Sequence, residues 1–451
     1  MTEISTLTPS RIVEELDKYI ISQSAAKRSV AIALRNRWRR QQVKGEMKHE
    51  IMPNNIIMIG PTGVGKTEIA RRIARLVDAP FVKVEASKFT EVGYVGRDVE
   101  SMIRELMSYS VVQTRTRMVD EVKAEARAMA IEKVLDILIP VKRRKTDRDD
   151  PETAARQKRS REKMRAKLMD GKLDDKEIEI EVSPEDNLPS FEIMSNFGLE
   201  ALDLDFSDML SNILPPRGGK KHKTTVFNAL KNFTEQEISR LVPKDKVAEV
   251  ARKAVEENGI VFIDEIDKIA TSEKTGGIDV SRSGVQRDLL PIVEGSSVPT
   301  KYGAVDTSHI LFIAAGAFSS AKPSDLIPEL QGRFPIRVEL NSLNEEDFVR
   351  ILSEPENALT KQYRELFATE KVELRFSSGA IKEIAKYAAV ANEKMEDIGA
   401  RRLHTILNAL LDDFLFQMPD PKIKKINISQ KMVSARLSPV IESEDLSRFI
   451  L

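Results

Sequence analysis

Residues 60–67 read Gly60-Pro61-Thr62-Gly63-Val64-Gly65-Lys66-Thr67, and this stretch decides the fold. Its spacing, G-x-x-x-x-G-K-[ST], lets successive backbone N–H groups curl around phosphate oxygens. Lys66 supplies a point charge for the β- and γ-phosphates, and the hydroxyl of Thr67 is a ligand for Mg²⁺. The alternative is a glycine-rich turn that only caps a helix.

The flanking sequence favours the phosphate-binding interpretation. The apolar run 54–59 predicts a buried strand directly before the loop, and residues 68–77, which begin with Glu68, predict a helix directly after it. Residues 80–85 predict a second strand. A helix that starts at the loop directs the positive end of its dipole at a phosphate. We therefore expect an α/β P-loop NTPase core with ATP as its ligand, and count Glu68 among the nucleotide-binding candidates.

A second apolar strand ends in two acids, Ile260-Val261-Phe262-Ile263-Asp264-Glu265. Carboxylates at the end of a buried strand require a cation or a water to stabilise them. We expect Asp264 to hold Mg²⁺, in part through water, and Glu265 to orient and deprotonate the attacking water. A strand that leaves the core into an acidic loop is the alternative.

The remaining chain predicts three parts. Residues 97–139 contain no Gly or Pro and predict one long helix or two in line. A mixed-charge block follows at 141–165, and we expect it to be mobile, as we do a second stretch around 215–220. Residues 220–223 (Lys-Lys-His-Lys) could bind phosphate, but a solvated flexible loop is the favoured interpretation. Helical pattern resumes over 225–243. The predicted domains are 1–110 with 245–340 (nucleotide-binding), 111–244 (a mostly helical, partly disordered insert) and 341–451 (an α-rich domain). Further strands are predicted at 259–264, 309–314, 335–340, 372–376 and 424–428.

Composition narrows the function. The 451 residues carry 71 basic and 71 acidic side chains, so no global field steers the chain to nucleic acid or to an anionic membrane. The absence of cysteine excludes thiol nucleophiles and Cys-ligated zinc. No apolar stretch approaches the roughly 18 residues that span a bilayer, and residues 1–10 lack the features of a secretory signal. We expect a cytoplasmic protein.

Several motifs resemble the ClpX/HslU family of AAA+ ATPases. Gly93-Tyr94-Val95-Gly96 is similar to the family's pore loop, 332–335 (Gly-Arg-Phe-Pro) to its arginine-finger segment, and 399–403 (Gly-Ala-Arg-Arg-Leu) to its sensor-2 helix. Residues 444–451 resemble the C-terminus of HslU-type members. The resemblance covers the first 110 residues and everything after about 245, and it is weak over 143–223. ClpX-type chains differ in having a cysteine-bound zinc domain and no large insert.

The resemblance implies a homohexamer that unfolds proteins and passes them to an HslV-type threonine peptidase. Tyr94, between glycines, would grip unfolded or tagged substrates, unless it is only a half-buried turn residue. Arg333 has no obvious local acid and would reach the γ-phosphate bound by a neighbouring subunit, with Glu329 near the same subunit junction. The alternative is that Arg333 is only a surface arginine. Arg401 would contact the phosphates rather than form a surface salt bridge. Ile21 would line the adenine pocket or pack in the core. The apolar tail residues would dock on the peptidase or pack on their own domain: Leu446, Phe449, Ile450 and Leu451.

Two positions depart from the family pattern. Ser22 stands where glycine is usual, and Ala315 follows a strand where related ATPases often place a polar sensor. Since Ala315 cannot bond the attacking water, we expect hydrolysis to depend more on Glu265.

Alternative functions remain open. The chain could be a ClpX-like unfoldase for another peptidase, a nucleic-acid motor, or an ATP-switched scaffold that does not hydrolyse. Only 5% of residues are aromatic, which disfavours the stacking platforms of a nucleic-acid motor. No Ser-His-Asp arrangement is recognisable, so the chain itself is not expected to cut peptides.

Overall fold

The computed structural model describes residues 7–90, 97–139, 151–182, 220–270, 280–420 and 422–442. The chain divides into two compact units. The first unit comprises Met1–Gln113 and Ala248–Leu451, and the second comprises Thr114–Val247.

A five-stranded parallel sheet forms the centre of the first unit. The strand order is β2 (Phe81–Glu85), β5 (Ile260–Asp264), β8 (Leu311–Gly316), β1 (Ile56–Ile59) and β9 (Ile336–Glu339). Because all five strands run the same way, their carboxyl ends meet at one edge. In open α/β sheets ligands bind at that edge. The four strand positions predicted around 54–59, 80–85, 259–264 and 309–314, and the fifth at 335–340, are confirmed.

Alternate residues of the strands enter two separate apolar clusters, as the period of two in a strand requires. Ile57, Val261 and Phe312 pack into one, while Met58, Phe262 and Ile313 pack into the other. The second cluster includes apolar residues from α1 (Pro9–Asp17), α2 (Ser24–Gln42) and α4 (Lys66–Leu76). Further elements of this part of the chain are α3 (Met47–Glu50), α9 (Lys244–Asn258), α10 (Val280–Glu294), β6 (Ser297–Thr300), β7 (Gly303–Asp306) and α11 (Pro328–Arg333).

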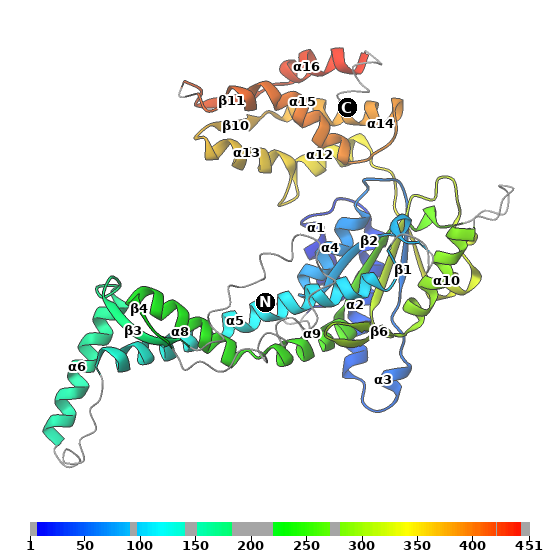
Figure 1. Ribbon diagram of the computed structural model, residues 1–451. Helices are drawn as coiled ribbons and strands as arrows, with labels where there is room; N and C mark the ends of the chain where they lie inside the picture. The colour runs from blue at the N-terminus through cyan, green and yellow to red at the C-terminus, as the bar shows by residue number, and fades with distance from the viewer. Residues whose placement is uncertain are drawn as a thin grey trace. The chain divides into compact units, whose positions relative to one another are not determined.

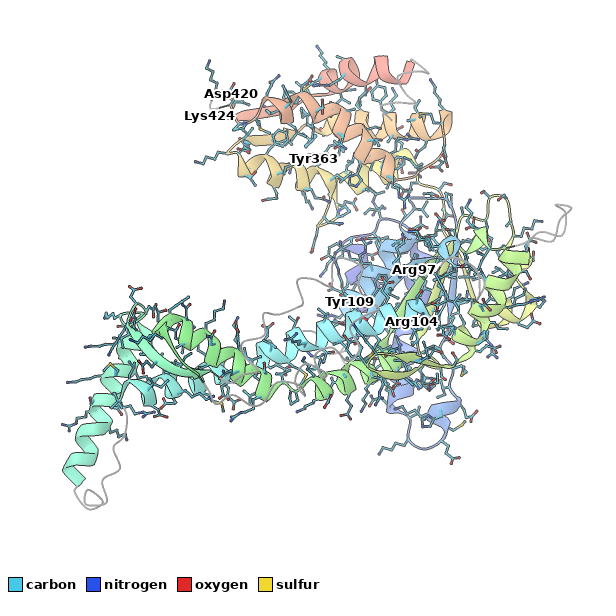
Figure 2. All side chains as sticks on the ribbon, in the orientation of Figure 1. Arg97, Arg104, Tyr109, Tyr363, Asp420 and Lys424 are labelled. Atoms are coloured by element: carbon cyan, nitrogen blue, oxygen red, sulfur yellow. The ribbon has the colours of Figure 1, made fainter. Side chains whose placement is uncertain are left out.

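The helix α5 (Ser101–Leu138) is one continuous helix, so the first of the two predictions for 97–139 is confirmed. Arg104, which is labelled on this helix in Figure 2, pairs near the helix start with Asp98 at 2.5 Å and with Glu100 at 3.0 Å. Acidic groups at a helix N-terminus also interact favourably with its dipole.

The C-terminal segment of the first unit has its own apolar cluster, which includes Phe348, Phe367, Leu374 and Leu407. A parallel pair of short strands joins five helices here. The elements are α12 (Glu345–Ser353), α13 (Leu359–Thr369), β10 (Glu373–Phe376), α14 (Ser378–Lys394), α15 (Arg401–Gln417), β11 (Lys425–Ile428) and α16 (Gln430–Glu442). The strands predicted at 372–376 and 424–428 are confirmed. The domain boundary at 341 remains a prediction.

The second unit corrects two expectations. Its hairpin of β3 (Glu177–Val182) and β4 (Lys220–Thr225) lies beside α8 (Val226–Leu241) (Figure 1). The expectation of a solvated loop at 220–223 was therefore wrong, because these residues pair with an acidic strand, as in the register Glu179↔Lys223. Opposite charges directly across a strand pair stabilise it.

The second correction concerns the mixed-charge block. Residues 151–165 of the block are helical, because α6 (Pro151–Met169) begins at residue 151. Arg161 of α6 bonds Glu132 of α5 at 2.7 Å and Asp136 at 2.6 Å, and Leu168 is buried in the unit's apolar cluster. The hydrogen bonds from Arg161 hold the pKa of Glu132 below its ordinary value. Specific ion pairs, not a broad apolar face, position this helix. Residues 140–150 and 215–219 lie outside the described residues.

Among the helices in the described ranges, none is both long and apolar enough to cross a bilayer.

Candidate nucleotide site

The loop between β1 and α4 has the backbone that its glycines predict. Gly60, Gly63 and Gly65 all have positive φ, at 153°, 77° and 105°. A Cβ at Gly63 would lie 2.0 Å from the carbonyl oxygen of Ile398, which no side chain tolerates. The loop therefore needs glycine at position 63 for conformation and for close approach to another segment.

Lys66 is held inside this loop by main-chain oxygens. Its ammonium donates to the carbonyl of Gly60 and, at 2.7 Å, to that of Pro61. The side chain is only 8% exposed. Burial lowers the pKa of Lys66, Asp264 and Asp267 act in the opposite direction, and Arg401 lowers it further. Bound anionic phosphates would stabilise the charged form of this amine.

Thr67 and Asp264 face each other across the strand edge. The Thr67 hydroxyl donates to Asp264 Oδ2 over 3.4 Å, and Lys83 Nζ contacts the same oxygen at 2.8 Å. Lys83 was missed in the sequence because its approach depends on β2 pairing with β5, in the register Glu85↔Asp264. Strand order is not visible in an isolated strand pattern.

The chemistry of this pair suits Mg²⁺. Both side chains offer hard oxygen donors, and Mg²⁺ typically binds through one or two protein oxygens together with substrate phosphates and water. Across the described ranges, no three His, Asp or Glu side chains gather as ligands for one ion. A phosphate-assisted Mg²⁺ site does not need such a cluster.

Glu265 is exposed, and its backbone is left-handed, with φ at 56°. Non-glycine residues with positive φ are uncommon and often occur at functional sites. Ser87 donates to Glu265 Oε2 at 2.9 Å, and the Glu265 amide donates to Asp264 Oδ1 at 3.1 Å. The first contact orients the Glu265 carboxylate and the second orients that of Asp264, both at the carboxyl edge of the sheet.

One cavity of about 690 Å³ brings these groups together. Its volume is within the range of ligand pockets. The predicted residues that line it are Ile21, Thr62, Gly63, Val64, Gly65, Lys66, Thr67, Glu68, Asp264, Glu265 and Arg401. Gly60 and Pro61 do not line it, and they act on it through Lys66.

The far wall comes from the C-terminal segment. The amide of Ala400 donates to the carbonyl of Gly63 at 3.1 Å, so the turn before α15 is bonded directly to the phosphate loop. Arg401 and His404, one turn apart on α15, both line the cavity. His404 was missed, although its i+3 spacing from Arg401 indicates a shared helix face.

The wall at the other end contains Tyr19, Ile20 and Ile21. Ile21 is buried, as both interpretations of it require. The Arg72 guanidinium stacks 3.8 Å from the ring of Tyr19, whose hydroxyl donates to Glu356 at 2.7 Å. The N-terminal segment and the C-terminal segment therefore also meet at this end of the cavity.

Arg333 and Glu329 do not line the cavity of their own chain. Both lie on α11, Glu329 is exposed, and the Arg333 side chain is 42% exposed. The expectation that Arg333 has no local acid was wrong, because it pairs with Glu294 at 2.9 Å. That partner is distant in sequence, so only the tertiary structure reveals it.

The two departures have simple structural settings. Ser22 has φ at 57°, which explains why glycine suits this position, and its hydroxyl donates to Asp347 Oδ1 at 2.5 Å. Ala315 is fully buried on β8. The predicted pore-loop residues 93–96 and the tail residues 446–451 lie outside the described residues.

A phosphate loop at the carboxyl edge of a parallel sheet, an acidic strand end and an arginine from a helical C-terminal segment define an AAA+ ATPase. Two family models agree: "ATPase family associated with various cellular activities (AAA)" matches residues 56–154, and "AAA domain (Cdc48 subfamily)" matches residues 187–337.

Relatives identify the family. The proteins called "ATP-dependent protease ATPase subunit HslU" from Persephonella marina and Syntrophomonas wolfei are each 53% identical, with 99% of each chain covered. The protein of the same name from Oleidesulfovibrio alaskensis is 52% identical, over 99% of this chain and all of that relative. The chain therefore belongs to the HslU family, and it is the regulatory ATPase of an ATP-dependent protease.

Proposed function

We propose that this chain is an ATP-driven protein unfoldase and translocase. It would assemble as a ring of six in the cytoplasm, grip unfolded or tagged proteins, and pass them to an HslV-type threonine peptidase that it activates. One observation carries the mechanical part of the proposal. The phosphate loop is bonded to the turn that carries Arg401, through the Ala400 amide and the Gly63 carbonyl at 3.1 Å.

This contact couples nucleotide chemistry to movement. A triphosphate in the cavity would contact the loop on the sheet side and Arg401 on the helical side. Loss of the γ-phosphate removes negative charge that Arg401 attracts, and it shifts the preferred position of the C-terminal segment relative to the sheet. Closure of two packed segments around a ligand is a common form of such switching.

The catalytic roles follow from the positions of the groups. Lys66 would leave the Gly60 and Pro61 carbonyls to bond the β- and γ-phosphates. Mg²⁺, held through Thr67 and Asp264, neutralises phosphate charge when it is bound. Glu265, held by Ser87, would orient the attacking water and take its proton. General-base catalysis of this kind contributes roughly 10²–10⁴-fold to a rate.

Arg333 would complete a site on the adjoining subunit. Its side chain is partly exposed and that of its acid partner Glu294 is 36% exposed, so the pair is accessible to solvent. Surface ion pairs are worth only about 0–1 kcal/mol, so the guanidinium can exchange this carboxylate for a γ-phosphate at little cost. Glu329, on the same short helix, would lie at the same junction.

Two sequence segments have residue types that suit contacts with substrate and with the peptidase. Tyr94 lies between glycines, which suits a mobile paddle with one amphipathic ring. The apolar tail residues would insert into the peptidase, and burial of each large side chain would stabilise the complex by about 2 kcal/mol. These residues are Leu446, Phe449, Ile450 and Leu451.

The test is degradation of a stably folded protein by the purified chain mixed with an HslV-type peptidase. The proposal predicts degradation with ATP, none with ADP, and none with the Lys66→Ala variant. Degradation with a different self-compartmentalised peptidase but not with the HslV type would assign the chain to another protease. Stimulation of ATP turnover by DNA, with none by unfolded protein, would contradict the proposal.

A further inference from the structure

A second cavity, of about 260 Å³, lies on the first unit away from the phosphate loop. Its walls come from the C-terminal half of α2, the segment before β1 and the start of β8. None of the residues that line it lines the nucleotide cavity. They are Ala33, Asn36, Arg37, Arg39, Arg40, Val43, Ile51, Met52, Pro53, Asn54, His309 and Leu311.

Arg37 is the unusual member of this lining. Its side chain is buried, and its terminal nitrogens donate to three main-chain carbonyls, of Asn258 at 3.0 Å, Gly259 at 2.8 Å and His309 at 2.9 Å. Among the described residues no carboxylate forms an ion pair with it. Burial, aided by the charge of Arg40, lowers the pKa of Arg37 to about 9. Its charge is thus desolvated and bonded to neutral main-chain dipoles, while the charge of Glu257 acts on it without a direct ion pair and raises its pKa.

Two residues of the lining each have a buried side-chain nitrogen with no hydrogen-bond partner in the described part of the chain. One is Nε of Arg37 and the other is Nδ1 of His309. Buried polar atoms in native proteins are nearly always bonded, so an orphaned pair on one cavity requires an explanation. A ligand that accepts hydrogen bonds would satisfy the Arg37 donor, and the protonated form of Nδ1 would donate in the same way.

The charges around the cavity are unbalanced. Glu257 pairs with Arg40 at 2.8 Å and with Lys48 at 3.4 Å, so one carboxylate serves two cations. Arg37 and the exposed Arg39 add two further positive charges. A single negative group in the cavity would compensate part of this excess.

The rest of the lining is apolar, which limits the kind of anion. Ala33 and Leu311 are buried on the inner wall. Ile51 and Met52 line the cavity while remaining 38% and 42% exposed, and nearby Met47 is 66% exposed. Exposed large apolar side chains beside a pocket indicate a surface that contacts an apolar group.

We propose that this cavity binds a carboxylate carried on a short apolar body, with the anion at Arg37 and His309 and the apolar part against Ala33, Met52 and Leu311. A free organic acid and the C-terminal residue of a peptide share this chemistry. The site shares no lining residue with the nucleotide cavity.

Calorimetric titration of the full chain with N-acetyl-leucine tests the proposal. The matched probe N-acetyl-leucinamide has the same body without the charge, and acetate has the charge without the body. We expect the acid to bind about tenfold more tightly than either, because a charge-assisted bond to a buried guanidinium and the burial of an isobutyl group each contribute on that scale. Equal affinity of acid and amide would refute anion recognition, and equal affinity of acetate would refute the apolar part.

Two peptide probes distinguish the sources. A short Gly/Ser peptide ending in leucine, with a free or an amidated C-terminus, is titrated in the same way. Binding of the free-ended peptide as tight as that of N-acetyl-leucine assigns the site to protein C-termini. Binding of the small acid alone assigns it to a free organic acid. Absence of binding by every probe would overturn the proposal.

Replacing Arg37 would break its three bonds to main-chain carbonyls and could disturb the fold. A variant that fills the cavity tests the binding site without changing Arg37. Ala33→Met should fill the cavity and abolish binding of the acid. Ala25→Met, at an exposed position on the same helix, is the control and should bind normally. ATP turnover of both variants reports that they are folded. Undiminished binding by folded Ala33→Met would place the ligand elsewhere and contradict the proposal.

Discussion

Replacing Gly399 with alanine should weaken ATP use far more than it weakens the fold. Gly399 has φ at 57°, and a Cβ there would lie 2.5 Å from the carbonyl oxygen of Thr62 and 2.7 Å from the carbonyl carbon of Gly63. Both atoms are main chain, so no side-chain rotation relieves the overlap. The phosphate loop and the turn before Arg401 would have to separate by roughly 1 Å to restore ordinary van der Waals distances.

The expected magnitude follows from that separation. A residue other than glycine in the left-handed region costs about 1–2 kcal/mol, which lowers stability modestly. The additional shift lengthens the bond from the Ala400 amide to the Gly63 carbonyl and moves Arg401 away from the phosphates. A misplacement of about 1 Å in an active site can reduce a rate about 10²-fold. We therefore expect kcat/KM for ATP to fall by one to two orders of magnitude.

Gly45→Ala is the matched control. Gly45 also has positive φ, at 81°, but an added Cβ there meets no atom within 4 Å. It therefore shares the backbone strain without the overlap. Steady-state ATP hydrolysis, titration with a fluorescent ATP analogue and thermal melting are measured for both variants. Equal kcat/KM for Gly399→Ala and Gly45→Ala would refute the claim that this contact positions the nucleotide.

Three further predictions concern other groups. Glu265→Gln should bind ATP normally and hydrolyse it roughly 10²–10⁴-fold more slowly, measured by phosphate release, and a normal rate would remove Glu265 from catalysis. Arg333→Ala should reduce ATP turnover by on the order of 10³-fold. Glu294→Gln frees the same guanidinium and should leave ATP turnover near normal. Equal losses in the two variants would mean that the ion pair is only structural. Tyr94→Ala should retain basal ATP turnover and lose ATP-driven unfolding of a fluorescent protein, and normal unfolding would show that another side chain grips the substrate.

The sequence predicts the parts of this protein whose signals are local. The three inner strands of the central sheet, β5, β8 and β1, are short apolar runs, and the phosphate loop and the acids at 264 and 265 lie at the ends of two of them. Because parallel strands bring their carboxyl ends to one edge, both motifs lie at the same edge of the sheet. The cavity that contains both Lys66 and Asp264 is the consequence.

The missed features depend on tertiary contacts. Lys83 reaches Asp264 only because β2 pairs with β5, and Glu294 reaches Arg333 across 39 residues. Helix α6 shows no broad apolar face in its sequence, and its contacts with α5 include the pairs of Arg161 with Glu132 and Asp136, which sequence alone does not reveal. The hairpin of β6 and β7 was not predicted, because Ser297–Thr300 and Gly303–Asp306 are short and mostly exposed.

The most direct measurement is an experimental structure of the chain with Mg²⁺ and a slowly hydrolysed ATP analogue. We expect the triphosphate to lie along the main-chain amides of residues 62–67, with Lys66 Nζ on the β- and γ-phosphates, Mg²⁺ between Thr67 and Asp264, and Arg401 in contact from the C-terminal side. A nucleotide bound elsewhere, or Lys66 still bonded to the Gly60 carbonyl with Arg401 turned away, would contradict the account.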